Sequence, residues 1–150
     1  MPGPMVLSPD FREFVALLNA HEVRYLVVGG YAVAFHGHPR YTKDLDVWID
    51  RDPANAARLL LALADFGFGS VGLTTEDFLK PDQVVQLGRP PNRIDLITRL
   101  EGVDFASCYP YRETPEVGGI QIAFIDLDHL KQNKRAVGRY QDLADLENLE

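Results

Sequence analysis

The sequence predicts a single domain of the α+β or mixed α/β class. Segments with apolar residues at helical spacing are mixed along the chain with short apolar runs bounded by glycine, proline, asparagine or aspartate. Several of these runs are joined by hairpin-like turns, which a purely parallel sheet would not contain. A length of 150 residues suits one domain with a sizeable core, and no linker or repeat divides the chain, so one domain is expected over residues 1–150.

Helix starts and stops are marked by capping residues. The first helix is expected to start with Ser8 as N-cap and Pro9 at its first position, and apolar residues then recur at helical spacing through Leu18. Aspartate, a second good N-cap residue, precedes two later helices, and glycine ends them. The later helices are expected over residues 30–36, from 53 to Gly67, from 127 to about 135, and beyond Gly138 to the end.

Five short apolar runs are expected to form strands. Each is five to seven residues long, and turn-forming residues flank it. The third and fourth runs are joined through residues 88–92, Gly-Arg-Pro-Pro-Asn, as in a hairpin. The expected strands cover residues 24–29, 45–49, 83–87, 93–98 and 119–125.

Composition and charge limit the classes of function. The net charge of −7 argues against a broad nucleic-acid-binding surface, because phosphate contact depends on lysine and arginine. Four basic residues do cluster near the end, and a solvated helix face is their simplest interpretation: Lys131, Lys134, Arg135 and Arg139.

No apolar run is long enough for a membrane helix, the start lacks the features of a signal peptide, and the single cysteine cannot form an internal disulfide. A cytoplasmic location is therefore expected.

Two aspartates stand one residue apart at the start of the expected strand at 45–49. Because side chains two apart share a face of a strand, Asp44 and Asp46 point the same way. Two carboxylates that close repel each other and lose hydration, and a divalent cation such as Mg²⁺ or Mn²⁺ relieves both penalties. The alternative is that both are exposed at a strand edge and paired with Lys43 or Arg40, since so short a motif often occurs by chance.

A third carboxylate strengthens the metal hypothesis. Asp95 lies in an expected strand with apolar residues on both sides, where an isolated charge is costly unless it is paired or bound to metal. If this strand lies beside the one that carries Asp46, the three carboxylates converge on a site suited to two metal ions and phosphoryl transfer. The alternative for Asp95 is a salt bridge with Arg93 or Arg99.

Two further features lie close to these carboxylates in sequence. Gly29 and Gly30 stand between a strand and a short helix, where glycine permits close approach of the backbone and free N–H groups can face an anion. A tight turn without a ligand is the alternative. Trp48 shares the strand face of the aspartates and has the shape to stack on a base, but a core position is favoured.

These residues together resemble the nucleotidyltransferase superfamily of the DNA polymerase β type. The resemblance rests on the Gly-Gly-Tyr-Ala run at 29–32, on the Arg-Tyr-Thr-Lys-Asp-Leu-Asp run at 40–46, and on Asp95 in a separate strand. Within the superfamily the chain is most similar to small bacterial nucleotidyltransferases, which include toxins of abortive-infection, type IV toxin–antitoxin systems. The segments 134–139 and 142–147 are similar to the tail of that group, so the resemblance extends from about Tyr25 to the end.

The resemblance implies a nucleotidyltransferase fold, with a short mixed β-sheet flanked by helices and with further helices at the C-terminus. It implies that Gly29 and Gly30 hold the phosphates of an NTP, and that the three carboxylates bind two Mg²⁺ or Mn²⁺ ions. Asp95 would also help to activate the attacking hydroxyl. The polar positions of the motif are matched by Arg40 and Thr42, which would contact phosphate or fix the loop, and Lys134 matches a lysine that contacts the triphosphate.

The expected function is metal-dependent transfer of a nucleoside monophosphate from an NTP to an acceptor hydroxyl, with release of pyrophosphate. The acceptor stays open among RNA (tRNA in particular), protein and small molecules, and a toxin role would imply an antitoxin partner. One departure is that the first motif more often reads Gly-Ser, where this chain has Gly30. Two alternatives are a non-catalytic module that binds nucleotide or protein on the same fold, and a metal-dependent phosphohydrolase.

Overall fold

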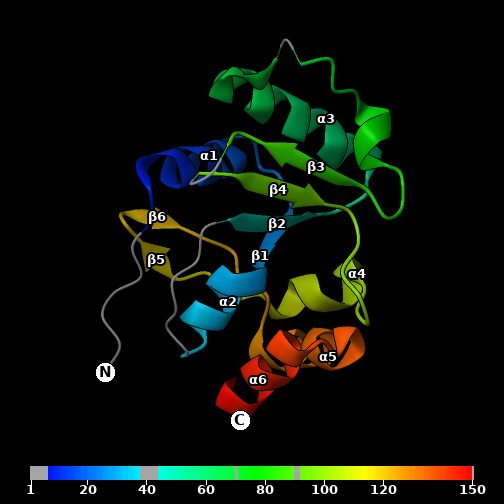
Figure 1. The fold of residues 1–150 in the computed structure, drawn as a ribbon. Helices are drawn as coiled ribbons and strands as arrows, with labels where there is room; N and C mark the ends of the chain where they lie inside the picture. Colours follow the sequence, from blue (N-terminus) through cyan, green and yellow to red (C-terminus); the bar gives the residue numbers. More distant parts are fainter. Residues whose placement is uncertain (1–6, 38–43, 70, 90–91, 150) are drawn as a thin grey trace.

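The computed structural model describes residues 7–37, 44–69, 71–89 and 92–149, and its ribbon is drawn in Figure 1. The helices of this part of the chain are α1 (Pro9–Ala20), α2 (Gly29–Phe35), α3 (Pro53–Leu63), α4 (Phe105–Cys108), α5 (Leu127–Val137) and α6 (Tyr140–Leu149). The strands are β1 (Tyr25–Val28), β2 (Leu45–Ile49), β3 (Val84–Leu87), β4 (Ile94–Ile97), β5 (Glu116–Val117) and β6 (Ile120–Gln121). None of these helices is both long and apolar enough to cross a bilayer.

The main sheet has four strands in the order β1-β2-β4-β3. β1 is antiparallel to β2, β2 is parallel to β4, and β4 is antiparallel to β3. The parallel pair at the centre is connected through α3 and the hairpin strand β3, while both outer pairs are antiparallel. The sheet is therefore short and mixed, and it is flanked by helices, which confirms the predicted fold class.

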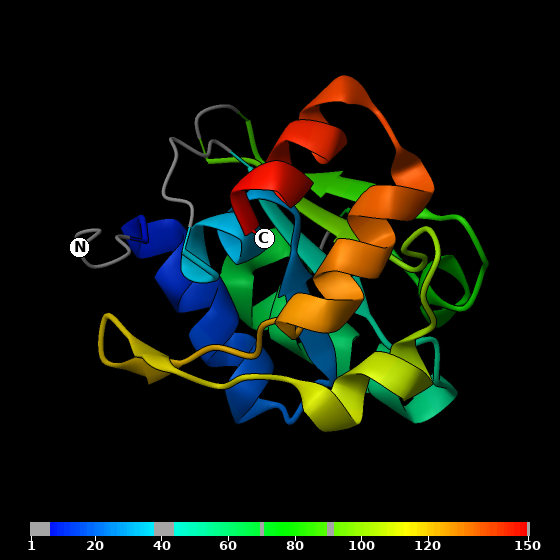
Figure 2. The same cartoon turned by 90° about the horizontal axis from the view of Figure 1, so that it is seen from below.

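The sheet lies between two groups of helices (Figures 1 and 2). α1 and α3 lie on one side of it, whereas α4, α5 and α6 lie on the other. Strand alternation directs Leu45, Val47 and Ile49 to the α1 and α3 side, where they are buried in the main apolar core. The opposite face of β2 carries Asp46 and Trp48, so the same alternation places a carboxylate on the side of the C-terminal helices.

The expected caps are present at the helix ends. Ser8 Oγ accepts a hydrogen bond from the Phe11 amide at 3.2 Å, and Asp52 accepts one from the Asn55 amide at 3.0 Å. Asp126 caps α5, whose end is set by Gly138 in the left-handed conformation with φ +68°. The α-helical hydrogen-bond pattern of α3 ends at Leu63, and a π-helical turn follows over Ala64–Phe68. The backbone leaves helical geometry at Gly67, with φ +103°, where the sequence predicted the end of the helix.

The prediction of one strand over residues 119–125 was only partly right. Its first part forms β6, which pairs with β5 in a small hairpin that was not predicted. Its second part passes the free edge of β1: the Val27 amide donates to the Ala123 carbonyl at 2.8 Å, and the Ile125 amide donates to the Val27 carbonyl at 3.1 Å. Gly118 and Gly119, both with positive φ, form the turn that joins β5 to β6.

Asn55 links α3 to the ends of two strands. Its side chain is fully buried; Oδ1 accepts from the Arg24 amide at 2.7 Å, and Nδ2 donates to the carbonyls of Arg24 and Asp50, both at 3.0 Å. Asn55→Ala would leave three buried backbone groups without this partner, so we expect it to lower the free energy of unfolding by roughly 3 kcal/mol. Urea unfolding measures this, with the exposed Asn92→Ala as control; equal stability of the two variants would contradict the assigned role.

Candidate active site

The sheet brings the predicted carboxylates together. In the parallel pair β2–β4, Asp46 lies directly beside Asp95, and Asp44 stands one residue before β2. The expectation that the strand of Asp95 lies beside that of Asp46 is thus confirmed by the register. Asp95 is buried, whereas Asp44 and Asp46 are half-buried, so the three side chains form a polar site that opens from one sheet face.

The titration of Asp46 is perturbed by its surroundings. Burial raises the pKa of Asp46 to about 7, and the negative charge of Asp95, a hydrogen bond with Asp95 and the charge of Asp44 act in the same direction. The guanidinium of Arg93 opposes this shift only in part. The site therefore carries an excess of negative charge that favours either a proton on Asp46 or a cation beside it.

Arg93 connects the two outer carboxylates. Its Nη2 donates to Asp44 Oδ2 at 2.8 Å, and its Nε donates to Asp95 Oδ1 at 3.1 Å. A second contact joins Nη2 to Asp95 Oδ2 at 3.4 Å. The salt bridge that was the alternative interpretation for Asp95 is therefore present with Arg93, whereas Arg99 pairs with Asp82 and Glu101 instead.

The N-terminal end of α2 lies against Asp46. Val28, the last residue of β1, is the antiparallel neighbour of Asp46, and α2 starts at the next residue. Gly29 has φ +67°, and a Cβ at this position would overlap the Oδ2 atom of Asp46. Glycine is needed here for both the backbone conformation and the space, so the first half of the Gly-Gly pair is tied to the carboxylate site.

The donor set fits a divalent cation that prefers oxygen. Three carboxylates within one site are typical ligands of Mg²⁺ or Mn²⁺, which commonly take one or two carboxylates and complete their shell with water and substrate phosphate. Within the part of the chain that the structure describes, no three His, Cys, Asp or Glu side chains are already arranged around one metal position. One oxygen of Asp44 and both oxygens of Asp95 accept hydrogen bonds from Arg93 instead.

The remaining predicted site residues are not brought to the carboxylates by any contact described here. Lys134 is only 5% exposed and pairs with Asp142 at 3.2 Å and Asp145 at 3.1 Å, between α5 and α6. Its expected place on a solvated helix face was wrong, because α6 packs over it. Burial opposes ionisation of Asp142, yet hydrogen bonds from Arg139 and Lys134 hold its pKa below the usual value. Arg40 and Thr42 lie outside the described residues.

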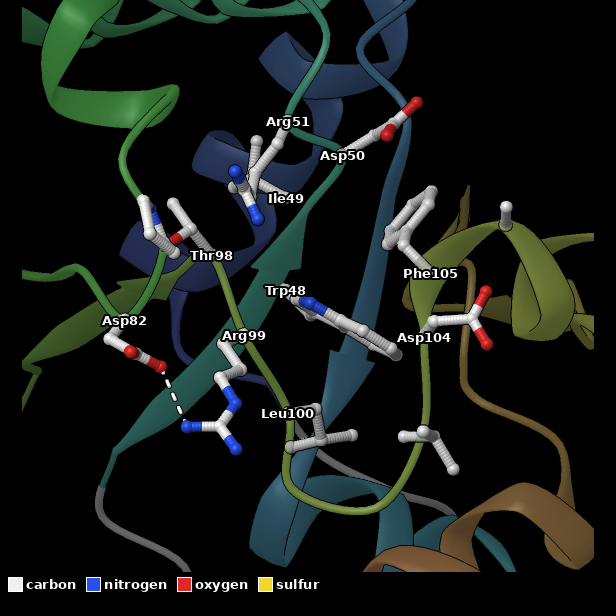
Figure 3. A pocket seen from close by; sticks show the side chains of 13 residues that line it. Trp48, Ile49, Asp50, Arg51, Asp82, Thr98, Arg99, Leu100, Asp104 and Phe105 are labelled. Atoms are coloured by element: carbon white, nitrogen blue, oxygen red, sulfur yellow. Dashed lines mark hydrogen bonds and ion pairs between the residues drawn. The ribbon is translucent and has the colours of Figure 1, made fainter.

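Trp48 belongs to the core, as favoured from the sequence. It is 2% exposed, and its ring meets the Phe105 ring edge-on at 5.2 Å. Both Trp48 and Phe105 line a pocket of about 460 Å³ at the far ends of β2 and β4, shown in Figure 3. The pocket is lined by Trp48, Thr98 and the Arg99–Asp82 ion pair, but by none of the three carboxylates of the site.

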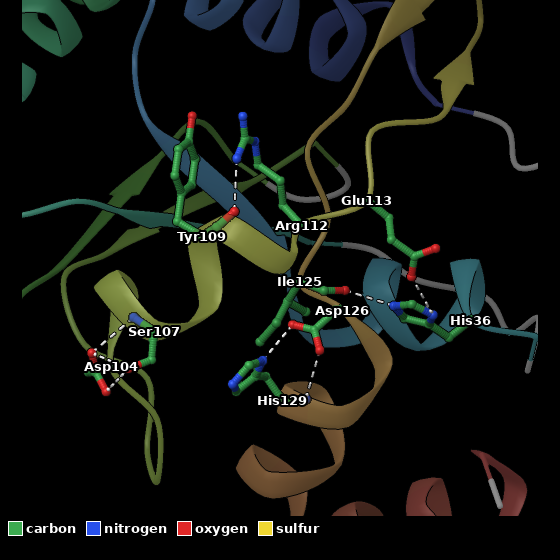
Figure 4. Close-up of polar contacts among 9 residues, drawn as sticks. All are labelled: His36, Asp104, Ser107, Tyr109, Arg112, Glu113, Ile125, Asp126 and His129. Atoms are coloured by element: carbon green, nitrogen blue, oxygen red, sulfur yellow. Dashed lines mark hydrogen bonds and ion pairs between the residues drawn. The ribbon is translucent and has the colours of Figure 1, made fainter.

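The far end of α2 is fixed by His36. Its Nε2 lies 2.7 Å from the Ile125 carbonyl, and its Nδ1 lies 3.6 Å from Glu113 Oε2, as Figure 4 shows. These contacts join the helix to the segment that passes the edge of β1. The helix that begins at Gly29 is thus held at both ends, and its position relative to Asp46 is set by the fold rather than by one contact.

Similar solved structures were found for nearly the whole chain. A protein of Thermotoga maritima described as a nucleotidyltransferase has a TM-score of 0.62 and 16% identity, over 95% of this chain and 93% of its own. An antigenic nucleotidyltransferase-like protein of Paracoccidioides brasiliensis has a TM-score of 0.54 and 21% identity, over 93% and 74%. The antibiotic-resistance factor ANT(2″)-Ia, in complex with adenylyl-2″-tobramycin, has a TM-score of 0.56 and 10% identity, over 93% and 84%.

Comparison with models of protein families gave no match, and neither did comparison with curated proteins. At these identities, the likeness to the solved structures concerns the fold. The chain has the nucleotidyltransferase fold, which confirms the fold that the sequence resemblance implied.

Proposed function

We propose that this chain uses its nucleotidyltransferase fold for metal-dependent transfer of a nucleoside monophosphate from an NTP to an acceptor hydroxyl. The observation that carries the proposal is the placement of Asp46 beside Asp95, with Asp44 bridged to Asp95 through Arg93 and with Gly29 packed against Asp46. A purely structural role for three clustered carboxylates is disfavoured, because burial and the neighbouring carboxylates raise the pKa of Asp46 to about 7 and so weaken the fold at neutral pH.

Each residue of the site has a defined part in this reaction. Mg²⁺ held by Asp44, Asp46 and Asp95 would supply charge neutralisation for the triphosphate and for the oxygens that attack and leave. Gly29 keeps the space beside Asp46 open, and the backbone N–H groups at Gly29 and Gly30 would donate to phosphate oxygens. Asp95 accepts the proton of the acceptor hydroxyl; the hydroxyl oxygen bonds to the α-phosphorus, and the bond from that phosphorus to pyrophosphate breaks.

The acceptor is proposed by class. ANT(2″)-Ia was solved with adenylyl-2″-tobramycin, so a small molecule has a precedent as acceptor on this fold. RNA and protein hydroxyls remain candidate acceptors. The net charge of −7 disfavours RNA, because it repels the RNA phosphates. Contacts of Arg40, Thr42 and Lys134 with substrate, and an antitoxin partner, remain proposals that rest on the sequence resemblance.

Metal-dependent binding of NTP tests the proposal at the level of the site. Titration calorimetry with each of the four NTPs should detect binding in the presence of Mg²⁺ and at least about ten-fold weaker binding with EDTA, because triphosphate and carboxylates repel each other without the cation. Asp44→Asn should lose the dependence on Mg²⁺, whereas Asp82→Asn, an exposed carboxylate outside the site, should keep it. Binding of equal strength with and without metal would favour a non-catalytic module.

A further inference from the structure

Arg93 is the cation that the structure places among the site carboxylates. Its guanidinium makes three contacts of 2.8–3.4 Å, one with Asp44 and two with Asp95. The side chains of Arg93, Asp44 and Asp95 are 30%, 32% and 12% exposed, so the ion pairs are partly shielded from water. A guanidinium stays charged at all ordinary pH values, and it therefore offsets part of the carboxylate charge permanently.

The contacts of Arg93 use the same oxygens that a metal ion would need. Both oxygens of Asp95 and one of Asp44 accept from the guanidinium. A divalent cation and the guanidinium cannot occupy the position between these two carboxylates together, because they repel each other and compete for the same lone pairs. Metal binding therefore requires the Arg93 side chain to leave.

Only the side chain of Arg93 has to move. Its carbonyl accepts a hydrogen bond from the Leu45 amide at 3.1 Å, so the main chain is tied to β2 directly beside Asp44. The side chain is long and partly exposed, which leaves it free to turn toward solvent over the same mouth of the site. A displaced guanidinium in that position is well suited to bind phosphate, which it recognises with paired N–H donors.

We propose that Arg93 is a built-in substitute for the metal ion and a positioning residue for the nucleotide. Without metal, its guanidinium holds Asp44 and Asp95 together; when metal binds, the same guanidinium turns to the phosphates of the incoming NTP. This inference rests on the proposed function, since it assumes a metal and an NTP at the site. It differs from a simple structural ion pair in one respect: loss of Arg93 should strengthen metal binding and weaken nucleotide binding.

The test uses Arg93→Gln and Arg93→Lys, with Arg99→Gln as matched control. Arg99 lies just beyond the other end of β4 and also bridges two carboxylates, Asp82 and Glu101, but outside the site. Mn²⁺ binding without nucleotide, followed by electron paramagnetic resonance, should tighten about ten-fold in Arg93→Gln and remain unchanged in Arg99→Gln. The KM for NTP should rise about ten-fold in Arg93→Gln and recover in part in Arg93→Lys.

Melting curves of the metal-free proteins show whether a change in binding by Arg93→Gln comes from misfolding of the variant. Without metal, Arg93→Gln should melt at a lower temperature than Arg99→Gln. Saturating Mn²⁺ should raise the melting temperature of Arg93→Gln by more than it raises that of the wild type. Mn²⁺ affinity that is unchanged or weaker in Arg93→Gln would overturn the inference and leave the proposed function intact. Absence of Mn²⁺ binding and of transfer in the wild type itself would overturn both.

Discussion

Asp46→Asn should abolish nucleotidyl transfer. The substitution removes the carboxylate that lies beside Asp95 and against Gly29, at the centre of the site. A metal ion in such a site contributes several kcal/mol to the stabilisation of the transition state, so a loss of about 10³-fold or more in kcat is expected. Initial rates of pyrophosphate release measure the effect, and Asp82→Asn should retain the rate of the wild type.

The same substitution should stabilise the protein when no metal is present. The folded chain holds the pKa of Asp46 at about 7, while the unfolded value is near 3.8, so the wild type loses stability as the pH rises from about 4 to 7. Above pH 7 this loss is complete. Each pKa unit corresponds to about 1.4 kcal/mol, and after solvent screening we expect Asp46→Asn to be more stable at pH 8 by roughly 2 kcal/mol.

Thermal melts in EDTA at pH 5 and pH 8 separate the pH-dependent stabilisation by Asp46→Asn from effects of the substitution that do not depend on pH. The advantage of Asp46→Asn over the wild type should be largest at pH 8 and should shrink at pH 5, where the wild-type carboxyl is protonated in the fold. Adding Mg²⁺ at pH 8 should raise the melting temperature of the wild type and not that of the variant. A variant that is less stable at pH 8 than the wild type would contradict the electrostatic account of the site.

Gly29→Ala should have the second largest effect, on both stability and transfer. A left-handed backbone costs alanine about 1–2 kcal/mol, and the new Cβ would overlap the Asp46 carboxylate, which must shift away. We expect a loss of roughly 3 kcal/mol in the free energy of unfolding, a melting temperature lower by about 10 °C, and transfer lowered by at least about 100-fold.

Gly138→Ala is the matched control for the backbone contribution. Gly138 has φ +68°, close to the +67° of Gly29, but a Cβ there would meet its nearest atom, the Arg135 carbonyl oxygen, at an ordinary 3.6 Å. The stability cost of Gly29→Ala beyond that of Gly138→Ala should decrease when Asp46 is also changed to alanine, while transfer stays absent. The overlap with Asp46 would be unimportant under two results together. Gly29→Ala and Gly138→Ala would lower the free energy of unfolding equally, and the effects of Gly29→Ala and Asp46→Ala would simply add in the double variant.

The sequence predicted the elements that carry strong local signals. The strand 45–49 was predicted to the residue, because alternation and flanking polar residues define it, and the caps at Ser8, Asp52 and Asp126 mark helix starts that the structure has. Sequence spacing also placed Asp44 and Asp46 on one face. It could not establish that Asp95 lies beside Asp46, since pairing of β2 with β4 depends on a register between segments about 50 residues apart.

What the sequence missed depends on tertiary contacts. Lys134 is charged and lies in a polar helix, and only the packing of α6 with its two aspartates reveals that it is buried. Arg93 was considered as a partner of Asp95 alone. Its spacing of two residues from Asp95 puts the side chains on one strand face, but its second contact, with Asp44, follows from the parallel pairing and had no sequence signal of its own.

The most direct test of the central claim is a transfer assay with four α-labelled NTPs, Mg²⁺ or Mn²⁺, and separate fractions of cellular RNA, protein and small molecules. The Asp44→Asn/Asp46→Asn double variant is the control. The account predicts that label from a preferred NTP enters one fraction with the wild type and with metal, and enters none with the double variant. Label that enters equally with the double variant, or none in any fraction with the wild type, would contradict the claim that these carboxylates form a nucleotidyltransferase site.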